Sequence, residues 1–545
     1  MPILANTRAP RSSTLKQDVF EIPWSALGLI ALMYVLTFTV LTTVEYAQHG
    51  LPLDDSYIHQ TVARNLADRG ILGFSQLHRS SGATSLLWTL IQATNYLLFR
   101  IDPVWYNLGI SYVLLALIGP LLFVMASRDR LPPFVSWVVA ISPALLGNFV
   151  WLGMIGMEHL LFAVFSLSAI YFWLLPPDNS LRSAVFTGCC AGLLVLTRPE
   201  SIPFAPLLFL FGWAVAHQRR RLREYLVVLA FWIVCTCIQF GANLYTSKTL
   251  MPATLKGRSW LYFHNTGGPH SIRSMARFCG AWVQRLPRQF STSYTHQLNS
   301  LREAATFYAF LGIILLVLTI VGVLFLLQRK PLRIGALVLW SGIHFSIYLF
   351  TFPTGGHGGR YQPLTLMLFF PLLVLGVYQL LSLLARGDRP WVKVAVVVFM
   401  CFASLASLGT WRRVTFAGIA HINNTHGKIA TWMRANVPTT DRFAAFDIGR
   451  VSYDWGGDVI DLGGLVDPTY VDYLQTGRVI EYLKLKQVQY VLLPSTGSDD
   501  LTINPSTLGG EKVAEYCSDP GDWLLGFRYT IHATQCQTLY RVTKW

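Results

Sequence analysis

Long apolar runs alternate with short polar segments along most of this chain. Shorter or interrupted apolar runs lie at 84–99, 183–197 and 201–216. A helix needs about 17 to 25 apolar residues to cross a bilayer. Runs of that length occupy residues 24–46, 105–126, 134–152, 158–175, 225–243, 306–327, 334–352, 363–384 and 394–410.

This pattern predicts a polytopic α-helical membrane protein. The twelve apolar runs, if all crossed the membrane, would return the C-terminus to the side of the N-terminus. The loop charges described below place the C-terminus outside instead. One run therefore does not cross fully, either 84–99, which is short, or part of 183–216, which Arg198-Pro199-Glu200 interrupts. That tripeptide is either a tight connection or a buried ion pair. We expect about eleven membrane helices, or about thirteen in the alternative.

Basic residues in short loops set the expected orientation, because such loops stay in the cytoplasm. They gather at 217–223, 329–333 and 386–393. The first run follows Arg8, Arg11 and Lys16 and has no obvious cleavage site, so it reads as a retained anchor with a cytoplasmic N-terminus. We expect a multi-pass protein of a bacterial inner or plasma membrane, with these outside segments: 47–83, 244–304, 353–362 and 411–545.

The sequence changes character after Trp411, where mixed polar residues replace the apolar runs. Residues 443–447 and 489–494 read as short buried strands, and 470–487 suits a helix. We therefore divide the chain into a transmembrane module, 1–410, and a small extracytoplasmic α/β domain, 411–545. Cys517 and Cys536 both fall in this domain, where a disulfide between them is as expected as two free thiols.

Composition supports the membrane assignment and excludes one class of partner. The chain of 545 residues is 53% hydrophobic and only 13% charged. Its net charge of +15 follows largely from the basic loops. No basic stretch carries interleaved aromatic residues in a soluble module, so we expect no nucleic-acid partner.

Two adjacent carboxylates, Asp54 and Asp55, open the first outside segment, in a chain with 28 acidic residues. Such a pair at an apolar boundary must be desolvated or matched with a cation. It is either a site of chemistry or a structural feature, namely a helix cap or the end of a solvated loop. If the segment is a helix, Asp55 and His59 lie four residues apart on one face, with Arg64 further along.

Several short motifs follow one another in an order that resembles the GT-C superfamily of membrane glycosyltransferases. The superfamily includes protein O-mannosyltransferases, the aminoarabinose transferase of lipid A and the mycobacterial terminal arabinofuranosyltransferases, whose first-loop pattern is the nearest. Many relatives have Asp-Glu where this chain has Asp-Asp. The motifs are the acidic pair, Arg64-Asn65-Leu66, Gly82-x-Thr84-Ser85-x-Leu87-Trp88, Gly156-Met157-Glu158, Leu196-Thr197-Arg198-Pro199-Glu200, Gly359-Arg360-Tyr361-x-Pro363, Asp447-Ile448-Gly449 and 459–468.

The resemblance implies an inverting glycosyltransferase that moves a sugar from a polyprenyl-phosphate donor to an acceptor hydroxyl. The acceptor would be an envelope glycan, a lipid or a protein on the extracytoplasmic face, and membrane lipids are the other partner. This reaction needs a carboxylate to take the acceptor's proton and cations to stabilise the departing phosphate. By position, Asp54 matches the superfamily's catalytic aspartate, and Asp55 would orient the acceptor or bind a cation.

Cations of the outside segments are the candidates for binding the donor phosphate. Arg360 is the first choice, because a glycine-rich loop carries it and a guanidinium can bind two oxygens at once. The other candidates are His59, Arg64, Lys256 and Arg258.

Three further residues, Tyr57, Glu158 and Tyr361, are expected to contact the substrate or the acceptor. A divalent cation, Mg²⁺ or Mn²⁺, is an open question, because the spacing shows no outer site with three ligands. If a metal binds, its ligands would be Asp54, Asp55 and His59.

Two other functions stay open as alternatives. A multi-pass lipid or glycan transporter or flippase should show two related halves and ionisable residues in mid-span, and the sequence shows neither. A non-catalytic membrane assembly subunit is the second alternative.

Overall fold

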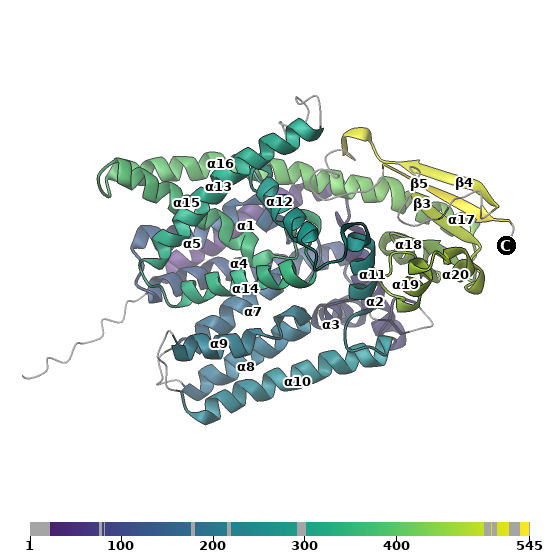
Figure 1. Ribbon diagram of the computed structural model, residues 1–545, viewed down its shortest axis with the longest axis horizontal. Coiled ribbons are helices and arrows are strands. Elements are labelled where there is room, and N and C mark those ends of the chain that lie inside the picture. The colour runs from purple at the N-terminus through teal and green to yellow at the C-terminus, as the bar shows by residue number, and fades with distance from the viewer. Residues whose placement is uncertain are drawn as a thin grey trace, which may run out of the picture.

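The apolar runs fold into a bundle of helices, and the polar C-terminal segment forms a small sheet domain at one end of it (Figure 1). The structure is a computed structural model that describes residues 22–75, 79–80, 82–175, 180–214, 220–291, 301–494, 503, 509–522 and 535–543. The orienting residues Arg8, Arg11, Lys16 and those at 217–219 lie outside the described residues.

The helices fall into two groups by their place along the chain. One group lies in the segments that connect the long helices of the bundle; it comprises α2 (Asp54–Arg69), α3 (Leu86–Thr94), α11 (Ala253–Phe263) and α12 (Ile272–Arg288). The bundle helices are α1 (Trp24–Thr42), α4 (Pro103–Arg128), α5 (Pro133–Leu145), α6 (Gly147–Trp151), α7 (His159–Trp173), α8 (Ser180–Thr197), α9 (Phe204–Ala214), α10 (Leu222–Ser247), α13 (Leu301–Leu327), α14 (Arg333–Thr351), α15 (Pro363–Leu384) and α16 (Pro390–Ile422).

Seven helices of the described chain are long and apolar enough to cross a membrane. They span Trp24–Tyr46, Pro103–Arg128, Leu222–Ser247, Thr306–Leu327, Arg333–Thr351, Pro363–Leu384 and Pro390–Asn436. Four shorter apolar helices are Leu86–Phe99, Pro133–Leu145, His159–Trp173 and Leu181–Thr197. The expected multi-pass helical membrane protein is thus confirmed, and the number of spans stays a prediction.

Local backbone breaks explain why some expected spans are shorter helices. Helix α5 ends where Leu146 turns to an extended conformation, with φ −95° and ψ 106°. Helix α8 ends at Thr197, because Arg198 is extended and the residue before a proline avoids helical angles. Pro199 then begins a single 3₁₀ turn, Pro199–Ser201, so the interruption is a tight connection.

Small residues let two bundle helices, α13 and α15, approach closely. A Cβ atom added to Gly322 would lie 1.8 Å from the carbonyl oxygen of Leu372, and one added to Gly376 would lie 1.9 Å from that of Leu318. Within a bilayer the hydrophobic effect does not hold helices together, so the van der Waals contacts that this close approach allows stabilise the pair.

The C-terminal domain that the sequence places outside, residues 437–543 with α17 (Lys428–Asn436), is named the outer domain; it is a five-stranded mixed sheet with helices packed on it. The strands lie in the order β2-β1-β3-β5-β4; β1 pairs in parallel with β2 and β3, and β5 pairs antiparallel with β3 and β4. The predicted strands at 443–447 and 489–494 are confirmed. The elements are β1 (Phe443–Ala445), α18 (Gly449–Trp455), β2 (Val459–Asp461), α19 (Pro468–Gln475), α20 (Val479–Leu485), β3 (Tyr490–Pro494), β4 (Gly510–Cys517) and β5 (Cys536–Val542).

A long helix passes through the boundary that the sequence predicts at residue 411. Helix α16 continues without a break through a π-helical turn at Asn423–Gly427 into α17 (Lys428–Asn436). One long helix therefore runs from the bundle into the outer domain, as Figure 1 shows along its upper edge. The buried core of the outer domain includes Ile429 and Met433 of α17.

The structure pairs Cys517 with Cys536 in a disulfide that links β4 to β5. Of the two alternatives for these cysteines, the paired one is therefore present.

Candidate active site

Helix α2 begins at the acidic pair, and the residues at this position favour the start of a helix. Leu53 before it is extended, and carboxylates in a first helical turn interact favourably with the helix dipole. Gly70 ends the helix in the left-handed conformation, with φ 67°. Successive helical positions point about 100° apart, so Asp54 and Asp55 face different neighbours.

Asp55 forms an ion pair with Arg360. The Arg360 side chain is 1% exposed, and one of its terminal nitrogens, Nη2, donates to Oδ2 of Asp55. Burial alone would raise the pKa of Asp55, but the guanidiniums of Arg360 and Arg258 together lower it well below its ordinary value. Asp55 is therefore a stable carboxylate beside a buried cation.

Arg360 keeps spare hydrogen-bonding capacity. Its Nε and Nη1 atoms are buried without a hydrogen-bond partner among the described residues. Because a buried donor without a partner is costly, such a guanidinium suits an anionic ligand with two oxygens.

The loop that carries Arg360 needs its glycines. Gly356, Gly358 and Gly359 have φ values of 65°, 63° and 84°, a region that other residues rarely adopt. A Cβ atom on Gly358 would also lie 2.4 Å from the Trp151 ring. The glycines thus fold the loop tightly, and they place Arg360 opposite α2.

A cavity of about 340 Å³ lies between α2, α11, the end of α14 and the Arg360 loop. This volume falls in the range of about 300–1,000 Å³ that small-molecule sites occupy. Apolar residues from several elements line part of it, including Ile58, Ile202 and Leu255. Its ionisable lining is made of Asp55, His59, Glu158, Arg198, Glu200, Arg258 and Arg360.

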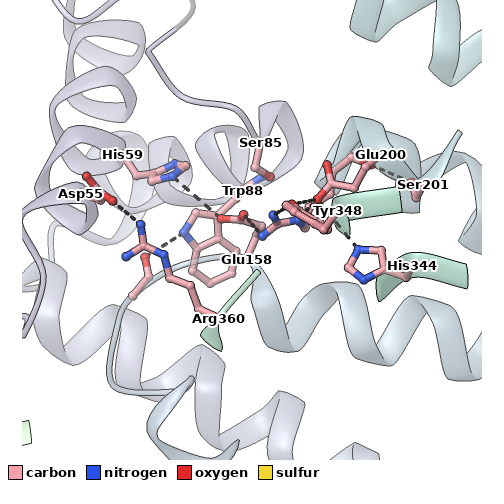
Figure 2. A network of polar contacts seen from close by, with 12 residues as sticks. Asp55, His59, Ser85, Trp88, Glu158, Glu200, Ser201, His344, Tyr348 and Arg360 are labelled. Carbon is pink, nitrogen blue, oxygen red and sulfur yellow. Dashed lines mark hydrogen bonds and ion pairs between the residues drawn. The ribbon is translucent and has the colours of Figure 1, made fainter. Parts of the chain in front are cut away.

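A buried network of charged and polar groups forms one wall of this cavity (Figure 2). Arg198 donates to Oε1 of Glu158 over 3.1 Å and to Oε1 of Glu200 over 2.5 Å. The Tyr348 hydroxyl lies 2.5 Å from both Arg198 Nη2 and Glu200 Oε1. The tripeptide at 198–200 is therefore a buried ion pair as well as a tight turn, so the two predicted alternatives hold together.

Asp54 faces the outer domain. Its two carboxylate oxygens accept hydrogen bonds from the backbone N–H groups of Gly449 and Arg450, both over 2.7 Å. Burial raises the pKa of Asp54 to about 6, although His426 and these two N–H groups oppose the shift. Its carboxyl group therefore changes charge near neutral pH, whereas that of Asp55 does not.

Two residues that the sequence did not single out as site residues lie beside Asp54. Nε2 of His426 lies 3.6 Å from Oδ2 of Asp447, and both groups influence the pKa of Asp54. His426 comes from the π-helical turn between α16 and α17, and Asp447 follows β1. The Asp447-Ile448-Gly449 motif is part of the GT-C resemblance, but nothing in its local sequence indicated contact with α2.

Six of the predicted site residues line the cavity: Asp55, His59, Glu158, Arg258, Arg360 and Tyr361. Burial lowers the pKa of His59, which favours its uncharged form, although Glu158 and Asp55 oppose the shift. Arg258 is held by a close contact between α11 and the outer domain: a Cβ atom on the preceding Gly257 would lie 2.2 Å from the carbonyl oxygen of Gly464.

Three other predicted residues bond elsewhere and do not line the cavity. The Tyr57 hydroxyl accepts from the Leu51 N–H over 2.9 Å and bonds to the Arg450 guanidinium. Arg64 donates to the carbonyl oxygen of Tyr453 over 3.1 Å and lies over that ring. Lys256 forms an exposed ion pair with Asp472 over 2.7 Å.

The carboxylates named as ligands for a divalent cation do not converge on one point. Asp54 bonds to two backbone N–H groups, while Asp55 pairs with Arg360. The nearest carboxylate to the His59 ring is instead Glu158, at 3.9 Å. Over the described ranges no group of three or more His, Cys, Asp or Glu side chains is arranged to hold a metal ion. These residues as they stand do not fit a metal site.

Comparison with solved structures identifies the fold. ArnT from Cupriavidus metallidurans, in the apo state, aligns with a TM-score of 0.54 over 95% of this chain and 98% of its own, at 12% identity. The same protein bound to undecaprenyl phosphate gives 0.52 over the same shares, also at 12% identity. Archaeal oligosaccharyltransferase AglB from Archaeoglobus fulgidus, in complex with an inhibitory peptide and a dolichol-phosphate, gives 0.52 over 86% of this chain and 70% of its own, at 12% identity.

These likenesses confirm the predicted GT-C fold, a polytopic helical membrane module with a small α/β domain near the C-terminus. Residues 417–540 match a domain of unknown function (DUF8728). No curated protein sequence matches the chain.

Proposed function

We propose that this protein is an inverting glycosyltransferase that moves a sugar from a polyprenyl-phosphate donor to an acceptor hydroxyl. The observation that carries the proposal is the buried Arg360 guanidinium, whose Nε and Nη1 atoms lack partners within the described chain beside the cavity. Solved neighbours with the same fold hold dolichol-phosphate and undecaprenyl phosphate, which supports a lipid-linked phosphate as the anion.

Arg360 and Arg258 would hold the donor phosphate. Both line the cavity, and among the lining residues at that end their two positive charges face the carboxylate of Asp55. The carboxylate of Asp447 also acts on Arg258, from outside the lining. A lipid phosphate gains negative charge as the sugar departs, so fixed guanidiniums stabilise the transition state more than the ground state. The apolar residues of the cavity lining suit the first isoprene units.

Asp54 is the proposed general base. The acceptor oxygen attacks the anomeric carbon from the face opposite the phosphate, and its proton passes to the Asp54 carboxylate. The bond between the anomeric carbon and the phosphate oxygen breaks, the oxygen keeps the electron pair, and polyprenyl phosphate leaves. Each Asp54 oxygen accepts one backbone hydrogen bond and keeps a second lone pair for this proton.

The placement of the acidic pair supports an acceptor that arrives from the outer-domain side. Asp54 faces α18 and Asp447, while Asp55 faces the cavity. Asp55 would then hold Arg360 in place next to the phosphate. This orientation, with the site on the extracytoplasmic face, follows the loop charges of the sequence.

The test is release of polyprenyl phosphate from sugar-linked polyprenyl phosphates by the purified protein in lipid nanodiscs, with an envelope extract as acceptor. Mass spectrometry of the released lipid reports turnover whether or not the glycosylated product is identified. Arg360→Ala should abolish release and Arg360→Lys should restore little of it, because an ammonium cannot bind two oxygens in a fork. Arg434→Ala, an exposed arginine of α17, is the matched control and should behave as wild type.

Release that persists in both Arg360 variants would contradict the proposal. Transport of the intact sugar-linked lipid across a vesicle membrane, without its cleavage, would instead favour the flippase alternative.

A further inference from the structure

The cavity has two chemically different ends. At one end the lining holds two guanidiniums, Arg360 and Arg258, and one carboxylate, Asp55. At the other end the carboxylates of Glu158 and Glu200 share the single guanidinium of Arg198, which leaves an excess of negative charge. His59 lies between Asp55 and Glu158 in Figure 2.

Glu158 has an unused acceptor in this cavity. The residue is 2% exposed, and its Oε1 accepts from Arg198 over 3.1 Å. Its Oε2 is buried without a hydrogen-bond partner in the described part of the structure, and Nε2 of His59 lies 3.9 Å from it, beyond hydrogen-bonding distance. A buried carboxylate oxygen in that state requires a donor.

His59 offers a second unused polar atom. The residue is 3% exposed and lines the same cavity, and no described residue bonds to its Nδ1 atom. Glu158 Oε2 and His59 Nδ1 are thus two orphan polar atoms on one wall. Neither is explained by contacts within the protein, and a ligand with several hydroxyl groups would satisfy both.

We infer that this end of the cavity is the subsite for the donor's sugar, that sugar hydroxyl groups bond to Glu158 and His59 there, and that the subsite excludes an anionic sugar. The inference rests on the proposed function, which places the phosphate at the Arg360 end. A uronic acid or a sulfated sugar would bring a second negative charge against Glu158 and Glu200, so the subsite excludes it. Arg198 cannot compensate, because both carboxylates already occupy its guanidinium.

Binding measurements on the full chain in nanodiscs test this inference separately from turnover. Three probes are compared: polyprenyl phosphate without a sugar, polyprenyl phosphate linked to neutral hexoses or pentoses, and polyprenyl phosphate linked to a hexuronate. The wild type should bind a neutral-sugar lipid more tightly than the sugar-free lipid, and the hexuronate lipid no more tightly than the sugar-free lipid.

Glu158→Gln replaces the free acceptor with an amide that can point its donor group at the sugar. It should weaken binding of the neutral-sugar lipid by about 10- to 100-fold, the usual loss for a hydrogen bond to a charged group. Binding of the sugar-free lipid should not change, which also shows that the variant is folded. His59→Asn is the second variant. It should lose part of the additional affinity that the wild type shows for the neutral-sugar lipid over the sugar-free lipid.

Asp129→Asn is the matched control. Asp129 also pairs with a buried arginine, Arg333, over 3.0 Å, but at the opposite end of α14 from the cavity. It should leave the affinity for all three probes unchanged.

Equal affinity of wild type and Glu158→Gln for the neutral-sugar lipid would overturn the sugar subsite, as would a preference for the hexuronate lipid. Failure of the wild type to bind even the sugar-free lipid would instead reject the phosphate site, and with it the proposed function on which the subsite rests.

Discussion

Asp54 and Asp55 are neighbours in the chain, yet they bond to different parts of the protein. Asp55 pairs with Arg360 in the loop between α14 and α15, while Asp54 accepts from the N–H groups of Gly449 and Arg450 that begin α18. The acidic pair therefore joins the lipid-phosphate end of the cavity to the outer domain. Because the two carboxylates have different partners, substituting each one separately distinguishes their roles.

The pH dependence of turnover should identify the base. If Asp54 takes the proton it must be ionised, and because its pKa is raised to about 6, turnover should fall as pH drops through about 6. The pKa of Asp55 is lowered, so Asp55 as base would keep turnover constant to well below pH 4. The measurement is the rate of polyprenyl phosphate release between pH 4 and 8.

Asp54→Asn should reduce the rate at pH 7 by roughly 10²- to 10⁴-fold, the usual contribution of a general base. Asp55→Asn should instead weaken donor binding, because Arg360 loses the partner that holds it. A normal rate in Asp54→Asn would show that this carboxylate only caps α18.

Contact between α2 and the outer domain should depend on the absence of a side chain at Gly449. A Cβ atom there would lie 2.0 Å from the Asp54 carbonyl oxygen, which is backbone and cannot move aside. We expect Gly449→Ala to destabilise the protein by about 1–3 kcal/mol and to speed proteolysis of the outer domain. Gly427→Ala is the control, since the nearest atom to its Cβ would be 3.5 Å away.

Local sequence patterns predicted some of the residues that line the candidate site. Asp55 and His59 follow from four-residue helical spacing, and Arg360 follows from a glycine-rich loop beside a helix. The cavity lining brings these three together. Arg258 also lines it, although its position depends on packing of Gly257 against Gly464, which no local pattern reveals.

The rest of the site could not be read from the sequence, because its contacts join distant segments. Asp54 bonds to residues 395 and 396 positions later in the chain. Arg64, expected at the phosphate, instead bonds to Tyr453, 389 positions away. Arg64 could reach several partners from its position on α2. The packing of the outer domain against α2 decides that it contacts Tyr453.

The Arg198 network should be essential for stability. Arg198→Met would leave Glu158 and Glu200 buried without their shared cation, at a cost of about 3–5 kcal/mol. The double variant Arg198→Met with Glu200→Gln should recover part of this loss, because it removes one of the two uncompensated charges. Thermal unfolding of the three proteins in detergent measures the effect; a double variant that is less stable than the single one would contradict it.

The disulfide should stabilise the outer domain in particular. Cys517 and Cys536 are 19 positions apart, and closing a loop of that size contributes about 3 kcal/mol. Replacing both by serine should speed proteolysis of 443–543 and leave the bundle intact. Cys401→Ser, at an exposed free cysteine, is the control. Equal proteolysis of wild type and the double variant would show that the disulfide contributes nothing measurable.

The most direct test of the account is a cryo-electron microscopy structure of the protein with polyprenyl phosphate. The account predicts phosphate oxygens within about 3 Å of Arg360 Nε and Nη1, with the lipid tail along the apolar lining of the cavity. Phosphate bound at another site, with Arg360 still bonded only to Asp55, would contradict it.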